Sequence, residues 1–245
     1  MNKIVCIIPA RLESTRFPRK ILKNLAGKPI LQWSWEAASR VGKFDSVVFA
    51  IDAQETAELI ESFGGSYIMT SKDCASGTDR LVELSRQGKI EADIWVNWQA
   101  DEPFISGDMI GRLLSTCDER DADVWTLKKR IKSEKDVMSP NIVKLVCDVN
   151  DYALYFSRSA IPFYRDEQER VFYKHIGLYA YTSEALKKIS LLRESDLEIA
   201  ERLEHLRFLQ YGLKIKVHET NEEVVGIDTR EDLLRAEEFV KNRSL

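Results

Sequence analysis

The chain has 245 residues, a mass of 28.2 kDa and a formal net charge of −4, because 36 Lys and Arg face 40 Asp and Glu. Such a mildly acidic composition lacks the basic field that attracts nucleic acid or an anionic membrane, so neither partner is expected. The length can bury one sizeable core. Since no repeat, low-complexity linker or break in composition interrupts the sequence, we predict a single domain over residues 1–245.

The cysteines and the apolar opening segment predict a cytoplasmic protein. Four cysteines lie far apart without a C-x-x-C pair, which argues against a zinc cluster or a disulfide framework. The apolar run at 4–10 contains Pro9 and is followed by Arg11, so it is much shorter than the roughly 20 residues of a membrane helix. It also lacks the uninterrupted apolar stretch of an export signal. A buried first strand is therefore expected.

Apolar patterning predicts alternating strands and helices in the first half of the chain. The expected elements there are a strand at 4–8, a helix at 29–41, strands at 46–51 and 66–69 around a helix at 54–63, a helix from Thr78 or Asp79 to 87, a strand at 93–98 and a helix at 107–119. This alternation is typical of a parallel sheet with helices on both faces.

The second half is richer in strands, which suggests a mixed sheet or a small subdomain. Its expected elements are strands at 124–128, 143–147, 153–156, 176–181 and 214–219, with helices at 183–189, 197–210 and 230–241.

Several common catalytic motifs are absent. The sequence has no G-x-G-x-x-G, no G-x-S-x-G and no H-E-x-x-H, and Leu22 stands where a P-loop ending at Gly27-Lys28 would need its first glycine. Only three histidines could act as bases. Function is therefore expected to depend on Arg, Lys and carboxylates. This composition suits phosphoryl chemistry, in which positioning and charge neutralisation dominate.

A basic segment, PARLESTRFPRK, directly follows the first expected strand. It holds four cations and two hydroxyl donors: Arg11, Arg16, Arg19, Lys20, Ser14 and Thr15. Ligands of open parallel sheets bind beyond the carboxyl ends of the strands, where this segment lies. Arg and Lys are the side chains that pair with phosphate oxygens, so the segment is a candidate polyphosphate site. The alternative is a solvated basic loop.

The sequence also has two acidic segments: one follows the expected strand at 93–98, and the other precedes the expected last helix at 230–241. Asp101 and Glu102 come at the end of the strand at 93–98, in NWQADEP, and Asp228 lies in GIDTRED. Carboxylates at one edge can hold Mg²⁺, which also bridges to phosphates. The alternatives are a turn with solvated acids for Asp101 and Glu102, and an ordinary helix N-cap for Asp228-Thr229. Spacing alone leaves open whether the two carboxylates converge.

The whole chain resembles one family of sugar-activating nucleotidyltransferases. The opening IVCIIPARLESTRFPRKIL is similar to their nucleotide-binding signature. The segments MTSKDCASGTDRL, VNWQADEP, YALYFSRSAIPF, YKHIGLYAYT, LEIAERLEHLRFLQYG and GIDTREDL follow in the order typical of CMP-Kdo synthetases, the 3-deoxy-manno-octulosonate cytidylyltransferases. This resemblance implies a three-layer, Rossmann-like fold. Its mixed, mostly parallel sheet would carry helices on both faces and a small strand-rich subdomain.

The resemblance also implies an activity and its residues. It implies transfer of CMP from CTP to an acidic sugar of the Kdo type, with Mg²⁺ as cofactor and a homodimer as the assembly. CTP would be bound by Ala10, Arg11, Ser14, Arg16, Lys20, Ser76, Gly77, Thr78 and Asp101. Arg11, Lys20, Asp101 and Asp228 would be catalytic, with Asp101 and Asp228 as the metal ligands. The sugar would meet Arg80, Gln99, Arg158, His175, Tyr179, Glu201 and Glu204.

Each sugar residue has an ordinary structural alternative, such as a strand cap for Arg158 or a solvated helix face for Glu201 and Glu204. The chain also departs from the family pattern, with Arg19 and Ala100 at positions where the family has glycine. These departures leave the acceptor open: it could be Kdo, its 8-amino analogue, another acidic sugar or an alcohol phosphate. An inactive nucleotide-binding paralogue is the remaining alternative.

Overall fold

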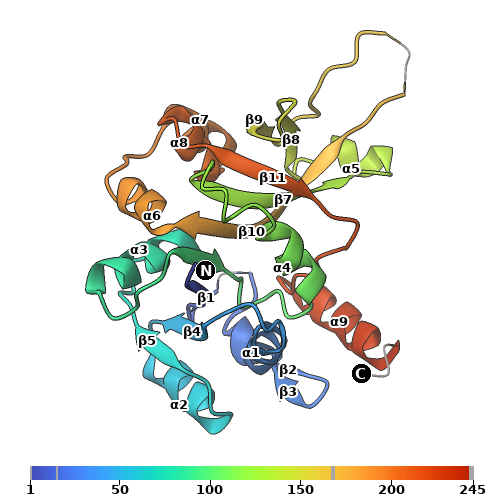
Figure 1. The fold of residues 1–245 in the computed structure, drawn as a ribbon. Helices are drawn as coiled ribbons and strands as arrows, with labels where there is room; N and C mark the ends of the chain where they lie inside the picture. The colour runs from blue at the N-terminus through green and yellow to red at the C-terminus, as the bar shows by residue number, and fades with distance from the viewer. Residues whose placement is uncertain (1, 15, 167–168, 243–245) are drawn as a thin grey trace. The chain divides into compact units, whose positions relative to one another are not determined.

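The computed structural model describes residues 2–14, 16–166 and 169–242, so the predicted donor Thr15 lies outside the described residues. The chain forms two compact units (Figure 1). Unit 1 comprises Met1–Ile110 and Glu223–Leu245, and unit 2 comprises Gly111–Glu222. Unit 1 is therefore built from both ends of the sequence. The prediction of a single domain stays a prediction.

Unit 1 contains a parallel sheet with the strand order β6-β1-β4-β5. The strands are β1 (Ile4–Ala10), β4 (Ser46–Ile51), β5 (Tyr67–Met69) and β6 (Ile94–Asn97). Residues 5–8 of β1 are fully buried because strands and helices cover them on both sides. The predicted strands of the first half are confirmed to within two residues at each end.

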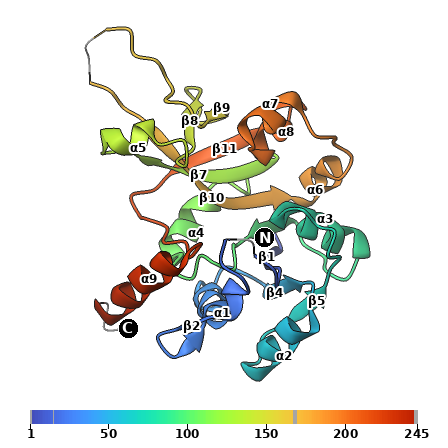
Figure 2. The same ribbon diagram turned by 180° about the vertical axis from the view of Figure 1, so that it is seen from behind.

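The helices of unit 1 cover both faces of this sheet. They are α1 (Ile30–Arg40), α2 (Gln54–Ser62) and α3 (Gly77–Gln87), with α4 (Gly107–Leu113) leading out of the unit and α9 (Arg230–Asn242) returning to it. Figures 1 and 2 show α1 and α2 on one side of the strands and α3 on the other. The connections from β1 run outward toward β5, and α3 then brings the chain back to β6 on the other side of β1. The carboxyl ends of β1 and β6 therefore form a topological switch point, where open α/β sheets bind ligands.

A separate apolar cluster anchors α9 to unit 1. Leu25, Ile30, Ile227 and Ala236 are fully buried together, and Trp33, Phe104, Leu233 and Val240 pack against them. The Ile227 N–H also donates to the carbonyl of Asp101, at 2.9 Å. Residues before α9 are thereby fixed beside the end of β6. Three short elements precede α1 and were not predicted: η1 (Lys20–Leu22), β2 (Asn24–Leu25) and β3 (Lys28–Pro29).

Unit 2 contains a mixed set of strands. Strand β7 (Val124–Arg130) pairs in parallel with β11 (Ile215–Glu219) and antiparallel with β10 (Tyr173–Thr182). Strand β8 (Lys144–Cys147) pairs with both β10 and β9 (Ala153–Ser157). The helices are α5 (Glu134–Met138), α6 (Ser183–Ile189), α7 (Asp196–Glu201) and α8 (Glu204–Gln210). The prediction of a mixed, strand-rich second half is confirmed.

Three predicted helix boundaries are wrong. The helix at 107–119 ends at Leu113. The expected helix at 197–210 is two helices, because Arg202 has a left-handed φ of 55° and ends α7. Ser76, not Thr78 or Asp79, is the N-cap of α3, and it forms a reciprocal capping box with Asp79. Among the described residues, no helix has the length and apolar character needed to cross a bilayer.

Candidate nucleotide-binding site

A cavity of about 260 Å³ lies in unit 1 and is lined by most of the predicted nucleotide residues. The predicted residues on its wall are Arg11, Ser14, Arg16, Lys20, Ser76, Gly77, Arg80, Gln99, Asp101 and Asp228. Ala10 and Thr78 are buried and are not part of that wall. Sequence reasoning missed the uncharged lining residues Pro9, Ile21, Cys74 and Ala75, which carry no chemical signature in a single sequence, whereas Ala100, noted as a departure from the family glycine, also lines the cavity.

Asp101 and Asp228 converge on one cation, Lys20. The Lys20 ammonium donates to the carboxylate of Asp101 and, at 2.7 Å, to that of Asp228. Burial alone would lower the pKa of Lys20, but the charges and hydrogen bonds of the two carboxylates together raise it above its ordinary value. Lys20 is therefore protonated at neutral pH. The open question of convergence is answered: the two carboxylates share one site.

Local capping explains why the Asp228 carboxylate is available to this site. Thr229 Oγ1 accepts the N–H of Asp232 at 3.2 Å, and the Asp232 carboxylate accepts the N–H groups of Asp228 and Thr229. Thr229 and Asp232 thus provide hydrogen-bond acceptors for the free backbone N–H groups at the start of α9. Of the Asp228-Thr229 pair, Thr229 is the residue that caps the helix, and the Asp228 carboxylate contacts Lys20 and Arg16 instead.

The remaining cations of the basic segment differ in their surroundings. Arg16 pairs with Asp228 at 3.0 Å; its own side chain is largely exposed and that of Asp228 is partly buried. Arg11 lines the cavity and forms no ion pair among the described residues. Arg19 has a left-handed φ of 56°, the conformation that a glycine adopts easily, and pairs with Glu55 of α2. The segment therefore keeps a glycine-like path, and Arg19 is not part of the cavity wall.

The beginning of α3 forms another wall of the cavity. Ser76 and Gly77 are lining residues, and a Cβ at Gly77 would lie 3.3 Å from both Asn97 and Pro9, closer than most real contacts. A side chain at this position would therefore push against the ends of β1 and β6. The N–H groups and positive dipole end of a helix favour anions such as phosphate.

Glu102 is a half-buried acid beside the two carboxylates. Its Oε2 atom is buried and has no hydrogen-bond partner within the described part of the chain. Burial, together with the negative charges of Asp101 and Asp228 and against the positive charge of Lys20, raises the pKa of Glu102 to about 8.

These residues fit a magnesium ion. The donor set consists of carboxylate oxygens, which Mg²⁺ prefers, and the convergence on Lys20 shows that both can approach one cation. The described residues contain no group of three or more His, Cys, Asp or Glu able to hold a metal. That is compatible with Mg²⁺, which is usually bound by one or two carboxylates together with substrate phosphates and waters.

In unit 2, Arg158 and Glu201 contact each other and the backbone. Arg158 Nε donates to the carbonyl of Glu201 at 2.7 Å, and its Nη1 donates to the carbonyl of Pro140 at 2.9 Å. The Glu201 carboxylate accepts from Ser157 Oγ at 2.6 Å and from the Arg158 N–H at 2.9 Å. Because α7 ends at Arg202, Glu201 and Glu204 lie on different helices, so the expected common helix face is wrong.

His175 and Tyr179 belong to an aromatic cluster that includes His205, a residue not predicted. Tyr179 OH lies 2.9 Å from His205 Nδ1, and the centroids of the two imidazole rings are 4.8 Å apart. Desolvation lowers the pKa of His175 to about 3 and lowers that of His205 as well. Both rings are therefore neutral at physiological pH. They therefore add no positive charge to unit 2.

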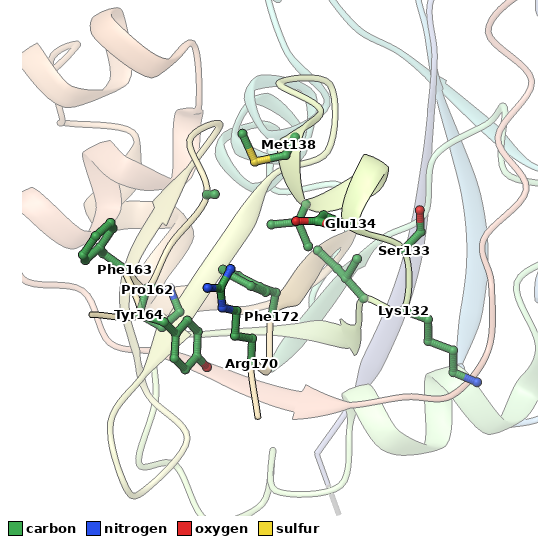
Figure 3. A pocket seen from close by; sticks show the side chains of 12 residues that line it. Lys132, Ser133, Glu134, Met138, Pro162, Phe163, Tyr164, Arg170 and Phe172 are labelled. Carbon is green, nitrogen blue, oxygen red and sulfur yellow. The ribbon is translucent and has the colours of Figure 1, made fainter. Parts of the chain in front are cut away.

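Unit 2 also contains a larger cavity of about 630 Å³ (Figure 3). Its wall is formed by residues 131–134, 137–138, 160, 162–164, 170 and 172. Met138, Pro162, Phe163 and Tyr164 give it a largely apolar character, and none of the predicted site residues line it. The smaller cavity of unit 1 is the stronger candidate because cations, carboxylates and a helix N-terminus meet there.

A parallel sheet with a cationic, carboxylate-bearing cavity at its switch point defines a nucleotide-binding enzyme of the transferase type. Residues 5–215 match the family model described as Cytidylyltransferase. The chain belongs to the cytidylyltransferase family, which confirms the resemblance found in the sequence.

Curated relatives match nearly the whole chain. The 3-deoxy-manno-octulosonate cytidylyltransferase of Thermodesulfovibrio yellowstonii is 45% identical, over 98% of this chain and 99% of the relative. The enzyme of the same name from Trichlorobacter lovleyi is 43% identical over the same shares.

Solved structures agree with the fold. A CMP:2-keto-3-deoxy-manno-octonic acid synthetase complexed with CTP superposes with a TM-score of 0.94 at 38% identity, covering 98% of this chain and 99% of that one. This match confirms the predicted fold class. The 4-diphosphocytidyl-2C-methyl-D-erythritol synthase of Anaerococcus prevotii, at 13% identity and a TM-score of 0.63, shares the fold alone.

Proposed function

We propose that this protein transfers CMP from CTP to the anomeric hydroxyl of Kdo, or of a close acidic analogue such as 8-amino-Kdo, and releases pyrophosphate. The product, CMP-Kdo, would serve lipopolysaccharide synthesis. The observation that carries the proposal is the convergence of Lys20, Asp101 and Asp228 in the unit 1 cavity. It occurs in a chain 43–45% identical, over nearly its full length, to enzymes named for this reaction.

The proposed reaction is an in-line displacement at the α-phosphorus of CTP. The anomeric oxygen of the sugar forms the new bond to phosphorus, the bond to the β-phosphate oxygen breaks, and the hydroxyl proton passes to solvent. Arg11 has no ion-pair partner among the described residues, and Lys20 has a third N–H beyond the two that meet carboxylates. Both cations can therefore stabilise the negative charge that develops on pyrophosphate.

Asp101 and Asp228 are the proposed holders of Mg²⁺. When bound, the ion would screen the approaching anions and lower the pKa of the attacking hydroxyl. The chain's own groups perform the positioning: the N-terminus of α3 and Arg11 orient the nucleotide, and Gln99 presents an amide at the cavity wall. Gln99 Nε2 donates to Asn97 Oδ1 at 3.3 Å, so its side-chain oxygen is free to accept from a ligand hydroxyl.

The sugar is proposed to contact Arg80, Gln99, Arg158, His175, Tyr179, Glu201 and Glu204, as the resemblance implies. The neutral state of His175 supports a hydrogen-bonding role toward hydroxyl groups. The carboxylate of an acidic sugar then needs its positive partner from an arginine. A cytoplasmic location and a homodimeric assembly also follow from the resemblance and belong to the proposal.

An acceptor panel tests this function. Pyrophosphate release is measured with each of the four nucleoside triphosphates against Kdo, 8-amino-Kdo, a nine-carbon acidic sugar and an alcohol phosphate. We expect release with CTP and a Kdo-type sugar, at a kcat/KM at least about 100-fold above the other pairs. Chelation should abolish it and added Mg²⁺ should restore it. CTP binding without release for any acceptor would contradict the proposal and favour an inactive paralogue.

A further inference from the structure

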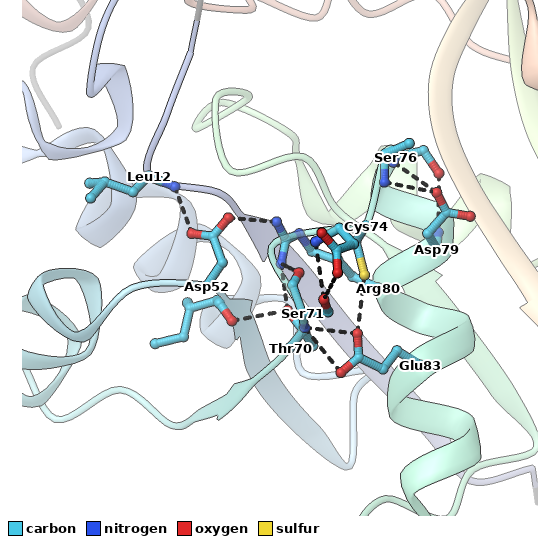
Figure 4. A network of polar contacts seen from close by, with 12 residues as sticks. Leu12, Asp52, Thr70, Ser71, Cys74, Ser76, Asp79, Arg80 and Glu83 are labelled. Atoms are coloured by element: carbon cyan, nitrogen blue, oxygen red, sulfur yellow. Dashed lines mark hydrogen bonds and ion pairs between the residues drawn. The ribbon is translucent and has the colours of Figure 1, made fainter.

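Asp52, directly after β4, joins two walls of the nucleotide cavity (Figure 4). Its Oδ1 accepts the backbone N–H of Leu12, in the segment that follows β1, at 2.9 Å. Its Oδ2 pairs with Nη2 of Arg80, on α3, at 2.7 Å. Leu12 adjoins Arg11, and Arg80 lines the cavity itself. A single carboxylate therefore links the basic segment to the helix that faces it.

The Arg80 guanidinium is fixed by further contacts. Its Nη1 donates to Thr70 Oγ1 and to the carbonyl of Ser71, and Thr70 Oγ1 in turn donates to the carbonyl of Ile51. The Arg80 side chain is 3% exposed and that of Asp52 is 11% exposed. Removing one partner of such a desolvated pair leaves an uncompensated charge, which must reorient or recruit water.

The ion pair between Asp52 and Arg80 also lies between two cavities. Arg11, Cys74 and Arg80 line both the nucleotide cavity and an adjoining cavity of about 300 Å³. Asp52 and Leu12 line only the adjoining cavity. Asp52 thus acts on the nucleotide cavity from behind, through the groups that it holds.

We propose that Asp52 is a positioning residue of the nucleotide cavity, setting the Leu12 backbone and the Arg80 guanidinium at a fixed separation so that CTP meets a preorganised site. This inference rests on the proposed function, because it takes CTP as the ligand. Preorganised walls lower the ordering cost of binding. The chemical step does not involve Asp52, so its loss should weaken nucleotide binding more than turnover.

The chain offers a matched control at the other end of the same strand. Asp45 Oδ2 accepts the N–H of Ile4, at the start of β1, at 2.7 Å. Asp45 therefore makes the same carboxylate-to-backbone contact as Asp52, but it lies at the amino end of the sheet and lines neither cavity. Comparing variants of Asp45 and Asp52 therefore separates a general loss of stability, which both should cause, from a loss of CTP affinity, which only the Asp52 variants should cause.

Three variants and the control are compared in the full-length chain. D52A removes both contacts, and D52N keeps an acceptor for Leu12 but places an amide against Arg80. T70V keeps the shape of the side chain but removes both hydrogen bonds of Thr70 Oγ1, the one from Arg80 and the one to the Ile51 carbonyl. D45N is the control. The CTP Kd is measured by calorimetry without acceptor, KM and kcat by pyrophosphate release, and stability by thermal unfolding.

For D52A we expect the CTP Kd and KM to rise about 10- to 100-fold, with kcat changed less than about threefold. D52N should show a smaller rise and T70V the smallest, while D45N should lower stability with a Kd within about twofold of wild type. Unchanged CTP affinity in D52A and D52N, or a fall in kcat alone, would overturn the positioning role. A wild-type chain that neither binds CTP nor releases pyrophosphate would overturn the proposed function and, with it, this inference.

Discussion

The two groups of predicted site residues are held in different ways. In unit 1, Lys20, Asp101 and Asp228 contact one another through side chains, and Arg11 forms no ion pair among the described residues. In unit 2, Arg158 and Glu201 meet each other through backbone groups, and His175 and His205 are neutral. Charged side chains that contact only one another can exchange those contacts for contacts with a charged ligand. Groups bound to the backbone mainly fix the local chain, so their replacement should affect stability first.

The largest expected effect is on catalysis in unit 1. Replacing Asp101 or Asp228 by Asn removes a charge from the proposed Mg²⁺ ligands and should lower kcat/KM by at least about 100-fold, with the fold intact. Pyrophosphate release over a range of Mg²⁺ concentrations measures the loss. Asp93→Asn is the control, because the Asp93 carboxylate accepts only the Lys3 N–H among the residues that the structure describes. Near-wild-type rates for both variants would remove these residues from the metal site.

The next effect concerns stability in unit 2. Glu201→Gln replaces one acceptor oxygen by a donor, so either Ser157 or the Arg158 N–H loses its partner. We expect the free energy of unfolding to fall by about 1–3 kcal/mol, measured in urea. Glu194→Gln, at an exposed position, should change it little. Unchanged stability together with a raised KM for the sugar would instead assign Glu201 to the substrate.

The histidine cluster predicts how stability depends on pH. The unfolded chain binds a proton on each histidine near pH 6.5, whereas the folded chain keeps His175 neutral down to about pH 3 and also holds the pKa of His205 low. Below pH 6.5 the unfolded state therefore binds more protons, and stability should fall as the pH falls. Removing one histidine should reduce this slope by up to about 1.4 kcal/mol per pH unit.

Urea unfolding of His205→Gln between pH 5 and pH 7 measures this slope. His218→Gln is the comparison, because His218 is only half-buried and should contribute less. An undiminished slope in His205→Gln would show that the folded state takes up the proton after all.

The smallest effect is expected at Arg19. Arg19→Gly relieves a left-handed backbone cost of about 1 kcal/mol, and it removes a half-exposed ion pair with Glu55 worth at most about as much. The free energy of unfolding should therefore change by less than about 1 kcal/mol. Glu55→Gln removes only the pair, so the difference between the two variants isolates the backbone term. A larger loss in Arg19→Gly would mean that the ion pair dominates.

Sequence alone predicted much of unit 1 because its signals are local. A buried strand followed by cations, and another followed by carboxylates, must bring both to one edge of a parallel sheet. Asp52 gave no such signal, since its importance depends on Leu12 and Arg80, which are 40 and 28 positions away. The division between α7 and α8 was not predicted because it depends on a left-handed backbone conformation at Arg202, and residues other than glycine rarely adopt that conformation. The burial of Glu102 depends on packing that no local pattern encodes.

The position of Asp228 has a consequence for how the enzyme is made. Lys20 and Asp228 meet across 208 positions of sequence, with the whole of unit 2 translated between them. At ribosomal rates of about 5–20 residues per second, Asp228 follows Lys20 by about 10–40 seconds. During that interval the nascent chain has Lys20 and, later, Asp101 but lacks their last partner. Synthesis therefore completes the pair of carboxylates that meets Lys20 only after the strands of unit 1 and the whole of unit 2 have been translated.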